Sequence, residues 1–366
     1  MGKTILIASG GTGGHLYPTI AIADVIKRER PDIEVVFIGT RDRIESREVP
    51  RAGYPFEPID IQAPRKTMRS LLSFPLVLRK AVSDSLRVIR KRKPSVMLGG
   101  GAYLSLPVGI AARLHGVPIG LLEINSIGGK ANKFLSRMAE RLFLAYPESK
   151  KDFPRMPSLR ITISGTPVRE DLGQTLESKQ EARQFFGLVT EQKTLFVFGG
   201  SLGARAINDA MKSLVAKFAE AHVNVLWQVG KGNDAEALQE SFKHLSGITI
   251  REYVYEMEKA YGAADLVVSR AGASSLAELA RLGKPVILVP YPFAAENHQE
   301  ENARAYEAAG AATVLRDSEL SEKLWDVATE LLADDARRVE MSQAMHKRDA
   351  PDAAKCVADW LIAKCG

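Results

Sequence analysis

The chain has 366 residues, 45% of them hydrophobic and 26% charged, with a formal net charge of +6 at pH 7. This composition is typical of a soluble globular protein and excludes a low-complexity or disordered chain, and the length predicts two domains. The two cysteines, Cys356 and Cys365, form neither a disulfide framework nor a zinc motif, which favours a reducing compartment. No apolar run reaches the roughly 18 residues of a bilayer span. Met1 leads directly into a core strand, so we expect no signal peptide.

The first motif is a glycine-rich loop at residues 10–15, Gly-Gly-Thr-Gly-Gly-His. It follows an apolar, β-branched run at 4–9 that predicts a buried strand, and it precedes a helix expected over 19–29. Glycines let backbone N–H groups approach an anion or a sugar at a helix start. His15, at the end of the loop, can exchange a proton near neutral pH. The loop therefore favours an enzyme that acts on a phosphorylated substrate, although His15 as a capping or packing residue is an alternative.

Two common nucleotide-binding motifs do not fit this loop. No Gly-Lys-Ser/Thr follows the glycines, as the phosphate loop of NTPases requires. The second strand, 34–39, is followed by Thr40 rather than by the acidic residue that binds the ribose of NAD. Both observations disfavour a P-loop NTPase and an NAD-dependent dehydrogenase.

Strand and helix patterns alternate through the first half of the chain. Alternation of this kind predicts a parallel sheet with helices on both faces. The expected strands are 4–9, 34–39, 95–99, 117–122 and 140–145, and the expected helices are 19–29, 75–92, 105–115 and 130–138. A Gly/Pro-punctuated stretch at 163–169 predicts a hinge.

The second half repeats the pattern, beginning with a strand at 194 and a second glycine loop at 199–205. Further strands are expected at 223–229, 248–250, 265–268 and 286–289, and helices at 204–219, 256–263, 274–281, 299–309 and 336–363. The predicted fold is α/β, with two Rossmann-like, doubly wound parallel-sheet domains that face a cleft. We place the domains at 1–164 and 165–340, and we expect a C-terminal helix in 341–366 to pack back on the N-terminal domain.

Two later segments carry polar groups suited to a nucleotide sugar. After the strand at 265–268, Ser274 or Ser275 can cap a helix whose N–H groups hold an anion, and Glu278 can bind two ribose hydroxyls. The alternative for Glu278 is a capping-box role. Gln299 and Asn302 share one helix face, which suits either sugar hydroxyls or a polar surface.

In chain order, the motifs resemble those of the MurG family. They are Gly-Gly-Thr-Gly-Gly-His at 10–15, Gly-Gly-Ser-x-Gly-Ala-Arg at 199–205, Ser-Arg-x-Gly-Ala at 269–273 with Glu278, and His-Gln-x-x-Asn-Ala at 298–303. The resemblance covers nearly the whole chain and implies a GT-B fold. It also implies transfer of N-acetylglucosamine (GlcNAc) from UDP-GlcNAc to undecaprenyl-diphospho-muramoylpentapeptide, with inversion, in peptidoglycan synthesis. No Asp-x-Asp occurs in the sequence, so we expect no metal-clamped diphosphate and no cofactor.

The resemblance also implies the roles of individual residues. The chemistry of the reaction itself requires a base for the acceptor hydroxyl, and we expect His15 in that role, with Glu123 as the competing base or an orienting group. Val254 and the 270–273 loop are expected to meet the uracil, Ser274 and Ser275 the diphosphate, Glu278 the ribose and Gln299 the sugar. The full set of implied substrate contacts is Thr12, Gly13, Gly14, Asn125, Arg169, Ser201, Val254, Arg270, Ala273, Ser274, Ser275, Glu278 and Gln299.

Two segments in the first half, 101–107 and 122–125, depart from the family pattern at several positions. Leu122 stands where the family usually has His, and Leu106 where it has Gly. Both lie in the half expected to hold the acceptor. They keep two alternatives open: a related glycolipid synthase, such as a diacylglycerol glycosyltransferase, and an inactive nucleotide-sugar-binding membrane partner.

A basic stretch at 65–94 carries ten Lys or Arg residues and one acid, Asp84. Basic residues around an apolar patch suit an anionic membrane surface, here by Phe74, Leu76, Leu78, Arg79 and Lys80. A core helix with a solvated basic face is the alternative. Nucleic acid is disfavoured because no aromatic stacking platform accompanies the charges. We therefore expect a peripheral protein on the cytoplasmic face of the cell membrane.

Overall fold

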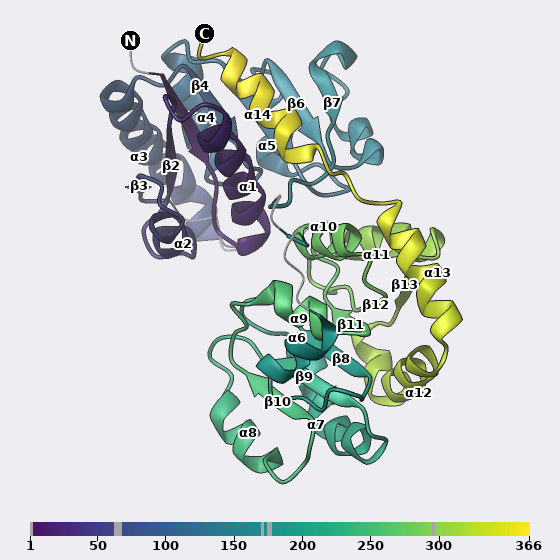
Figure 1. Cartoon of the computed structure of the whole chain (residues 1–366). Helices are drawn as coiled ribbons and strands as arrows, with labels where there is room; N and C mark the ends of the chain where they lie inside the picture. Colours follow the sequence, from purple (N-terminus) through teal and green to yellow (C-terminus); the bar gives the residue numbers. More distant parts are fainter. Residues whose placement is uncertain (1–2, 62–67, 170–171, 174–177, 295–296) are drawn as a thin grey trace. The chain divides into compact units, whose positions relative to one another are not determined.

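A computed structural model describes residues 3–61, 68–169, 172–173, 178–294 and 297–366. The chain divides into two compact units, the first comprising 1–169 with 350–366 and the second 170–349 (Figure 1). The predicted divisions lie at 164/165 and 340/341. The last 17 residues thus return to the first unit, and residues 341–349 stay with the second.

The first unit is built on a seven-stranded parallel sheet of order β3-β2-β1-β4-β5-β6-β7. Its strands are β1 (Thr4–Ala8), β2 (Glu34–Thr40), β3 (Phe56–Ile59), β4 (Val96–Gly99), β5 (Ile119–Glu123), β6 (Arg141–Leu144) and β7 (Ile161–Ile163). Its helices are α1 (Gly13–Glu29), α2 (Glu45–Arg51), α3 (Met68–Arg92), α4 (Ser105–Leu114), α5 (Lys130–Leu135) and α14 (Ala353–Ala363).

Alternation along β6 shows that helices cover both faces of this sheet. Leu142 and Leu144 lie in the core formed with α3, α4 and α5, whereas Phe143 points the other way. The Phe143 ring meets Trp360 of α14 edge to face, at 5.8 Å between centroids. Successive side chains of one strand are thus buried on opposite faces, as a doubly wound sheet requires.

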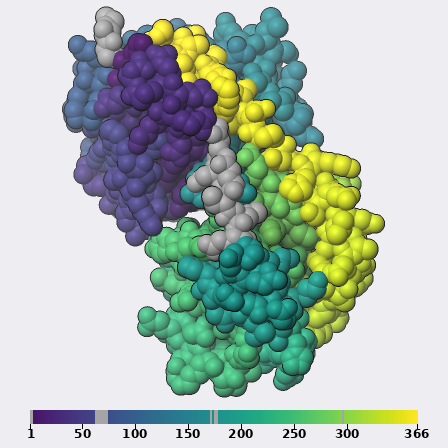
Figure 2. Space-filling model, in the orientation of Figure 1, coloured from purple at the N-terminus to yellow at the C-terminus, as the bar shows by residue number. Residues whose placement is uncertain are grey.

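Helix α14 packs beside α1, and Figure 2 shows the C-terminal segment in yellow against the N-terminal segment in purple. A Cβ at Gly120 would lie 2.6 Å from Trp360, so the close approach of α14 to β5 depends on this glycine. The predicted single helix over 336–363 is wrong. Helix α13 (Asp335–His346) ends before Pro351 and α14 starts after it, and a proline between two helical stretches disfavours one continuous helix.

The second unit repeats the architecture with a six-stranded parallel sheet of order β10-β9-β8-β11-β12-β13. Its strands are β8 (Thr194–Phe198), β9 (Asn224–Gln228), β10 (Ile248–Arg251), β11 (Leu266–Ser269), β12 (Val286–Leu288) and β13 (Ala312–Val314). Besides α13, its helices are α6 (Lys179–Phe185), α7 (Arg205–Glu220), α8 (Ala235–Phe242), α9 (Met257–Ala263), α10 (Ala273–Leu282), α11 (His298–Ala308) and α12 (Leu320–Ala333), with a short 3-10 helix η4 (Asp317–Glu319).

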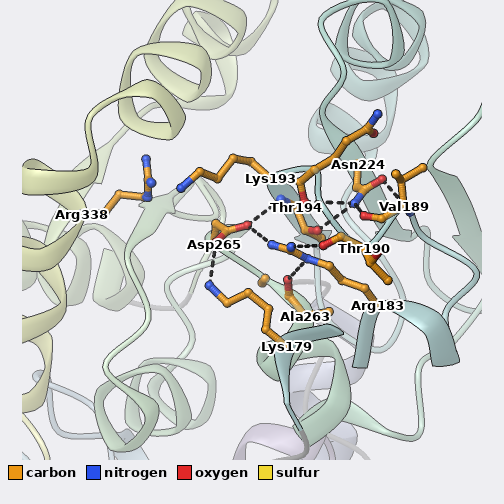
Figure 3. Close-up of polar contacts among 12 residues, drawn as sticks. Lys179, Arg183, Val189, Thr190, Lys193, Thr194, Asn224, Ala263, Asp265 and Arg338 are labelled. Atoms are coloured by element: carbon orange, nitrogen blue, oxygen red, sulfur yellow. Dashed lines mark hydrogen bonds and ion pairs between the residues drawn. The ribbon is translucent and has the colours of Figure 1, made fainter. Parts of the chain in front are cut away.

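A buried carboxylate joins three segments at the amino end of this second sheet (Figure 3). Asp265 accepts hydrogen bonds from Arg183 at 2.6 Å, from Lys179 at 2.7 Å and from the Thr194 N–H at 2.7 Å. Burial acts to raise the pKa of Asp265, but these hydrogen bonds and charges outweigh it and the pKa is lowered. Nearby, burial together with Lys179 lowers the pKa of Lys284 to about 8. Asp265 is therefore the anion that balances a local excess of positive charge.

No helix in the described ranges is both long enough and apolar enough to cross a bilayer.

Candidate active site

The loops after β1, β4 and β5 meet at the carboxyl edge of the first sheet. His15, the third residue of α1, has Nδ1 3.0 Å from the Gly100 carbonyl oxygen after β4. Gly101 adopts φ +92°, and a Cβ there would lie 3.1 Å from both His15 Nδ1 and the Leu122 carbonyl oxygen. Only glycine fits this position, which brings β5 and the imidazole together.

The contact with Gly100 selects one tautomer of His15. A carbonyl oxygen only accepts hydrogen bonds, so the neutral ring carries its proton on Nδ1 and donates it to Gly100. The other ring nitrogen, Nε2, then holds the lone pair. The loop geometry thus supplies an oriented proton acceptor at the start of α1.

A buried carboxylate fixes the first glycine loop. Glu45, fully buried at the start of α2, accepts the Gly11 N–H and the Thr40 N–H, each at 2.9 Å, and the Thr40 hydroxyl. A Cβ at Gly10 would lie 2.3 Å from the Glu45 side chain. The Gly11 N–H, which could otherwise bind an anionic ligand, is therefore bound to the Glu45 carboxylate.

Glu123, at the end of β5, is surrounded by donors. One oxygen accepts from the Asn125 N–H and side-chain amide, each at 3.2 Å. The other accepts from the Gly129 N–H at 2.8 Å and the Asn132 amide at 3.0 Å. The residue is 1% exposed, and burial raises its pKa although these hydrogen bonds oppose the rise. Of the two predicted roles, the geometry favours orientation of Asn125 and its loop over proton transfer.

In the second unit, the predicted donor residues follow β8, β10, β11 and β12 at the carboxyl edge of the sheet. Ser201 lies in the glycine loop after β8, and Val254 follows β10. Gln228, at the end of β9, joins these two loops: its amide donates to the Gly200 carbonyl at 3.1 Å and accepts the Val254 N–H at 2.9 Å. The Val254 N–H is thus already hydrogen-bonded within the protein, to Gln228.

Helix α10 presents its N-terminus at the same edge. Its N-cap is Gly272, and no side chain caps it, so the predicted capping by Ser274 or Ser275 is wrong. Ala273, Ser274 and Ser275 instead form the first turn of the helix, where N–H groups suit an anion. Glu278, one turn further on, accepts a hydrogen bond from the buried Tyr261 hydroxyl at 2.9 Å.

Arg270 has its guanidinium turned into the protein. It is buried, donates to the carbonyls of Val289 and Pro290 at 3.1 and 3.2 Å, pairs with Asp317 of η4, and lies over the Tyr291 ring. The Arg270 side chain therefore fixes the loop after β12. Gln299 accepts the Tyr291 N–H from the same loop at 3.0 Å.

The remaining predicted residues are more scattered. Asn302 is fully buried and donates to the Ala271 carbonyl, so its side chain braces the 270–273 loop rather than facing a sugar. Thr12 is exposed at the N-cap of α1, and Gly13 and Gly14 form the first residues of that helix. Arg169 is exposed at the end of the first unit. Glu45, Gln228 and Tyr261 could not be predicted as functional residues, because no sequence motif marks them.

Among the described residues, no group of three His, Cys, Asp or Glu side chains is placed to hold a metal ion.

Comparison with known families identifies both halves. Residues 5–144 match the glycosyltransferase family 28 N-terminal domain, and residues 194–357 match its C-terminal domain. A curated relative from Chlorobaculum tepidum is 41% identical over 98% of both chains, and one from Salinibacter ruber is 40% identical over 98% of this chain and 96% of its own. Both are named UDP-N-acetylglucosamine--N-acetylmuramyl-(pentapeptide) pyrophosphoryl-undecaprenol N-acetylglucosamine transferase.

Solved structures agree with this match. The crystal structure of Acinetobacter baumannii MurG superposes with a TM-score of 0.74 at 26% identity and covers 99% of both chains. A UDP-GlcNAc 2-epimerase from Neisseria meningitidis, at 15% identity and a TM-score of 0.70, shares the fold. Sequence, fold and relatives agree: this chain belongs to the MurG family of glycosyltransferases, within glycosyltransferase family 28, and has the GT-B fold.

Proposed function

We infer that the chain transfers GlcNAc from UDP-GlcNAc to the muramoyl 4-hydroxyl of undecaprenyl-diphospho-muramoylpentapeptide. The observation that carries this inference is the 41% identity, over 98% of both chains, to a relative named for that transfer. The reaction inverts the configuration at the anomeric carbon of the sugar. The acceptor hydroxyl attacks that carbon, the bond to UDP breaks, and an α-linked sugar becomes a β-glycoside.

We place the nucleotide part of the donor on the second unit. The uncapped N-terminus of α10, with Ala273, Ser274 and Ser275, suits the diphosphate and the charge that develops on the departing UDP. Glu278 suits the ribose hydroxyls, the Val254 carbonyl the uracil, and Gln299 the sugar. Ser201 belongs to the glycine loop beside them. Contacts from Thr12, Gly13, Gly14, Asn125 and Arg169 of the first unit stay predictions.

The acceptor hydroxyl must lose a proton as the glycosidic bond forms. His15 is the group best suited to take it, because Gly100 holds Nδ1–H and leaves the lone pair on Nε2. Glu123 is the weaker candidate because four hydrogen bonds already occupy its carboxylate. We assign it the role of holding Asn125.

The test of this function is an assay of the purified chain with radiolabelled UDP-GlcNAc and two lipid acceptors. We expect one β-linked GlcNAc on the 4-hydroxyl of the polyprenyl-diphospho-muramoylpentapeptide for each UDP released. Diacylglycerol, offered at the same concentration, should receive no sugar. Transfer to diacylglycerol alone would establish the related glycolipid synthase, and UDP-GlcNAc binding without transfer to either lipid would establish the inactive partner.

We propose that α3 attaches the protein to an anionic membrane surface. Leu76 is 70% exposed, and Arg79 and Lys80 beside it are also exposed. Phe74 and Leu78 are half-buried, so Leu76 is the main apolar contact. At the end of α3 the basic residues serve the fold instead: Lys91 and Arg92 both pair with Glu57. Arg65 and Lys66 of the basic stretch lie outside the described residues, as does the Arg69 side chain.

Replacing four exposed cations of α3 by Gln should weaken binding to phosphatidylglycerol-containing vesicles at least tenfold, since each contributes about 1 kcal/mol at an anionic surface. The affinity for UDP should not change. Sedimentation with vesicles measures the first quantity and calorimetry the second. The substituted residues are Arg79, Lys80, Arg87 and Arg90.

The matched control removes four exposed lysines of the second unit and should leave vesicle binding unchanged. High salt should weaken the wild-type interaction only in part, because Leu76 still inserts. Equal wild-type binding to anionic and neutral vesicles would instead make α3 a structural helix with a solvated face. The control residues are Lys212, Lys217, Lys243 and Lys323.

A further inference from the structure

Tyr261 is a fully buried tyrosine whose hydroxyl contacts a residue of the donor site. It lies on α9 and donates to Glu278 Oε2 on α10, at 2.9 Å. Its ring packs edge to face against Phe196 at 5.8 Å and Phe198 at 6.1 Å, both on β8. The three rings fix the position of the hydroxyl, since rotation of the tyrosine would break two aromatic contacts.

The hydroxyl is a permanent donor to the carboxylate. Burial, followed by the charge of Glu278 and the hydrogen bond to it, raises the pKa of Tyr261 well above its ordinary value. The phenol therefore keeps its proton at neutral pH. A hydrogen bond to a charged acceptor is stronger than one between neutral groups, so it selects one rotamer of Glu278.

We propose that Tyr261 is the positioning residue for ribose recognition: it holds the Glu278 carboxylate, before the nucleotide arrives, in the orientation that binds the ribose hydroxyls. The proposal rests on the proposed function, which assigns Glu278 to the ribose. A carboxylate already oriented loses less side-chain freedom when the ligand binds, and this difference appears as affinity. Tyr261 does not touch the reacting atoms, so turnover at saturating donor should be unaffected.

The experiment compares the affinities of UDP and 2′,3′-dideoxy-UDP, measured by calorimetry on the full chain. The wild-type protein should prefer UDP strongly, and Glu278→Ala should abolish the preference because both hydroxyls lose their acceptor. Tyr261→Phe, which removes one oxygen and keeps the rings, should weaken UDP binding about five- to tenfold. It should leave dideoxy-UDP binding within twofold, so that the preference shrinks, and kcat should stay at the wild-type value.

The matched control is Tyr54→Phe. Tyr54 donates to Asp24 at 2.5 Å in the first unit, so this variant breaks the same kind of tyrosine–carboxylate hydrogen bond away from the donor residues. It should change neither affinity. A general loss of packing in Tyr261→Phe would weaken both ligands equally, whereas the proposed role weakens only UDP.

The outcomes separate the two assignments. If Glu278→Ala keeps the preference for UDP, the ribose assignment of Glu278 fails and the positioning role fails with it. If Glu278→Ala abolishes the preference but Tyr261→Phe keeps it in full, only the role of Tyr261 is overturned. Should Tyr261→Phe not fold, the double variant with Glu278→Ala replaces it. The double variant should have the same affinity for UDP as Glu278→Ala. An affinity more than threefold lower than that of Glu278→Ala overturns the proposal.

Discussion

We expect His15→Ala to lower kcat by about 10²-fold or more while the affinity for UDP changes little. The reason is that general-base catalysis contributes roughly 10²–10⁴-fold, and the contact of Nδ1 with the Gly100 carbonyl leaves Nε2 of His15 as the proton acceptor. Steady-state kinetics with saturating UDP-GlcNAc measures kcat, and calorimetry measures the affinity for UDP.

The variant His15→Asn separates a catalytic role of His15 from a role in holding the loop at Gly100 in place. Its amide can still donate to the Gly100 carbonyl, but it cannot take a proton, so His15→Asn should be as inactive as His15→Ala. His244→Ala, at an exposed histidine of the second unit, should have wild-type activity. If His15→Asn restores kcat, the imidazole only braces the loop and Glu123 becomes the base to test.

The largest effect on stability is expected from Asp265→Ala. This substitution leaves Arg183 without its anion inside the protein and the Thr194 N–H without an acceptor. Loss of one partner of a buried ion pair costs about 3–5 kcal/mol, because the remaining charge stays buried and unpaired. The free energy of unfolding of the second unit should fall by that amount.

Urea unfolding followed by tryptophan fluorescence measures this loss. In a Trp360→Phe background the remaining tryptophans, Trp227 and Trp325, both lie in the second unit, so the signal reports that unit alone. Asp209→Ala is the control, since Asp209 is exposed and its ion pairs are worth at most about 1 kcal/mol. A loss for Asp265→Ala no larger than that of the control would show that its neighbours find water or other partners.

The starts of two helices could not be predicted from the local sequence. The predicted starts of the first helix and the basic helix are 19 and 75, next to Pro18 and at Pro75, whereas α1 begins at Gly13 and α3 at Met68. Proline lacks an N–H and collides with the preceding turn, so it usually begins or ends a helix. Pro18 is buried, and packing of α1 against the sheet keeps the helix continuous through it. Tertiary contacts of this kind leave no mark on the local sequence.

The strands and glycine loops could be predicted because their signal is local. Apolar, β-branched runs followed by glycine identify the carboxyl edge of a parallel sheet, which is where the structure places the candidate site. The partners of individual side chains could not be predicted. Arg270 belongs to a recognisable motif, yet its guanidinium pairs with Asp317, 47 residues further on. Contacts across such a separation arise only when the sheet has formed.

The carboxylate of Glu45 makes the first glycine loop electrostatically different from the second. The two loops have similar sequences. In the first loop the Gly11 N–H donates to the Glu45 carboxylate, whereas among the described residues no acidic side chain accepts a hydrogen bond from the loop at 199–203. A second negative charge about 4 Å from Glu45 would meet a repulsion of about 4 kcal/mol near a protein surface. A diphosphate at Gly11 would therefore meet a repulsion for which the loop at 199–203 has no counterpart among the described residues. One internal acid thus distinguishes two glycine loops whose sequences are nearly the same.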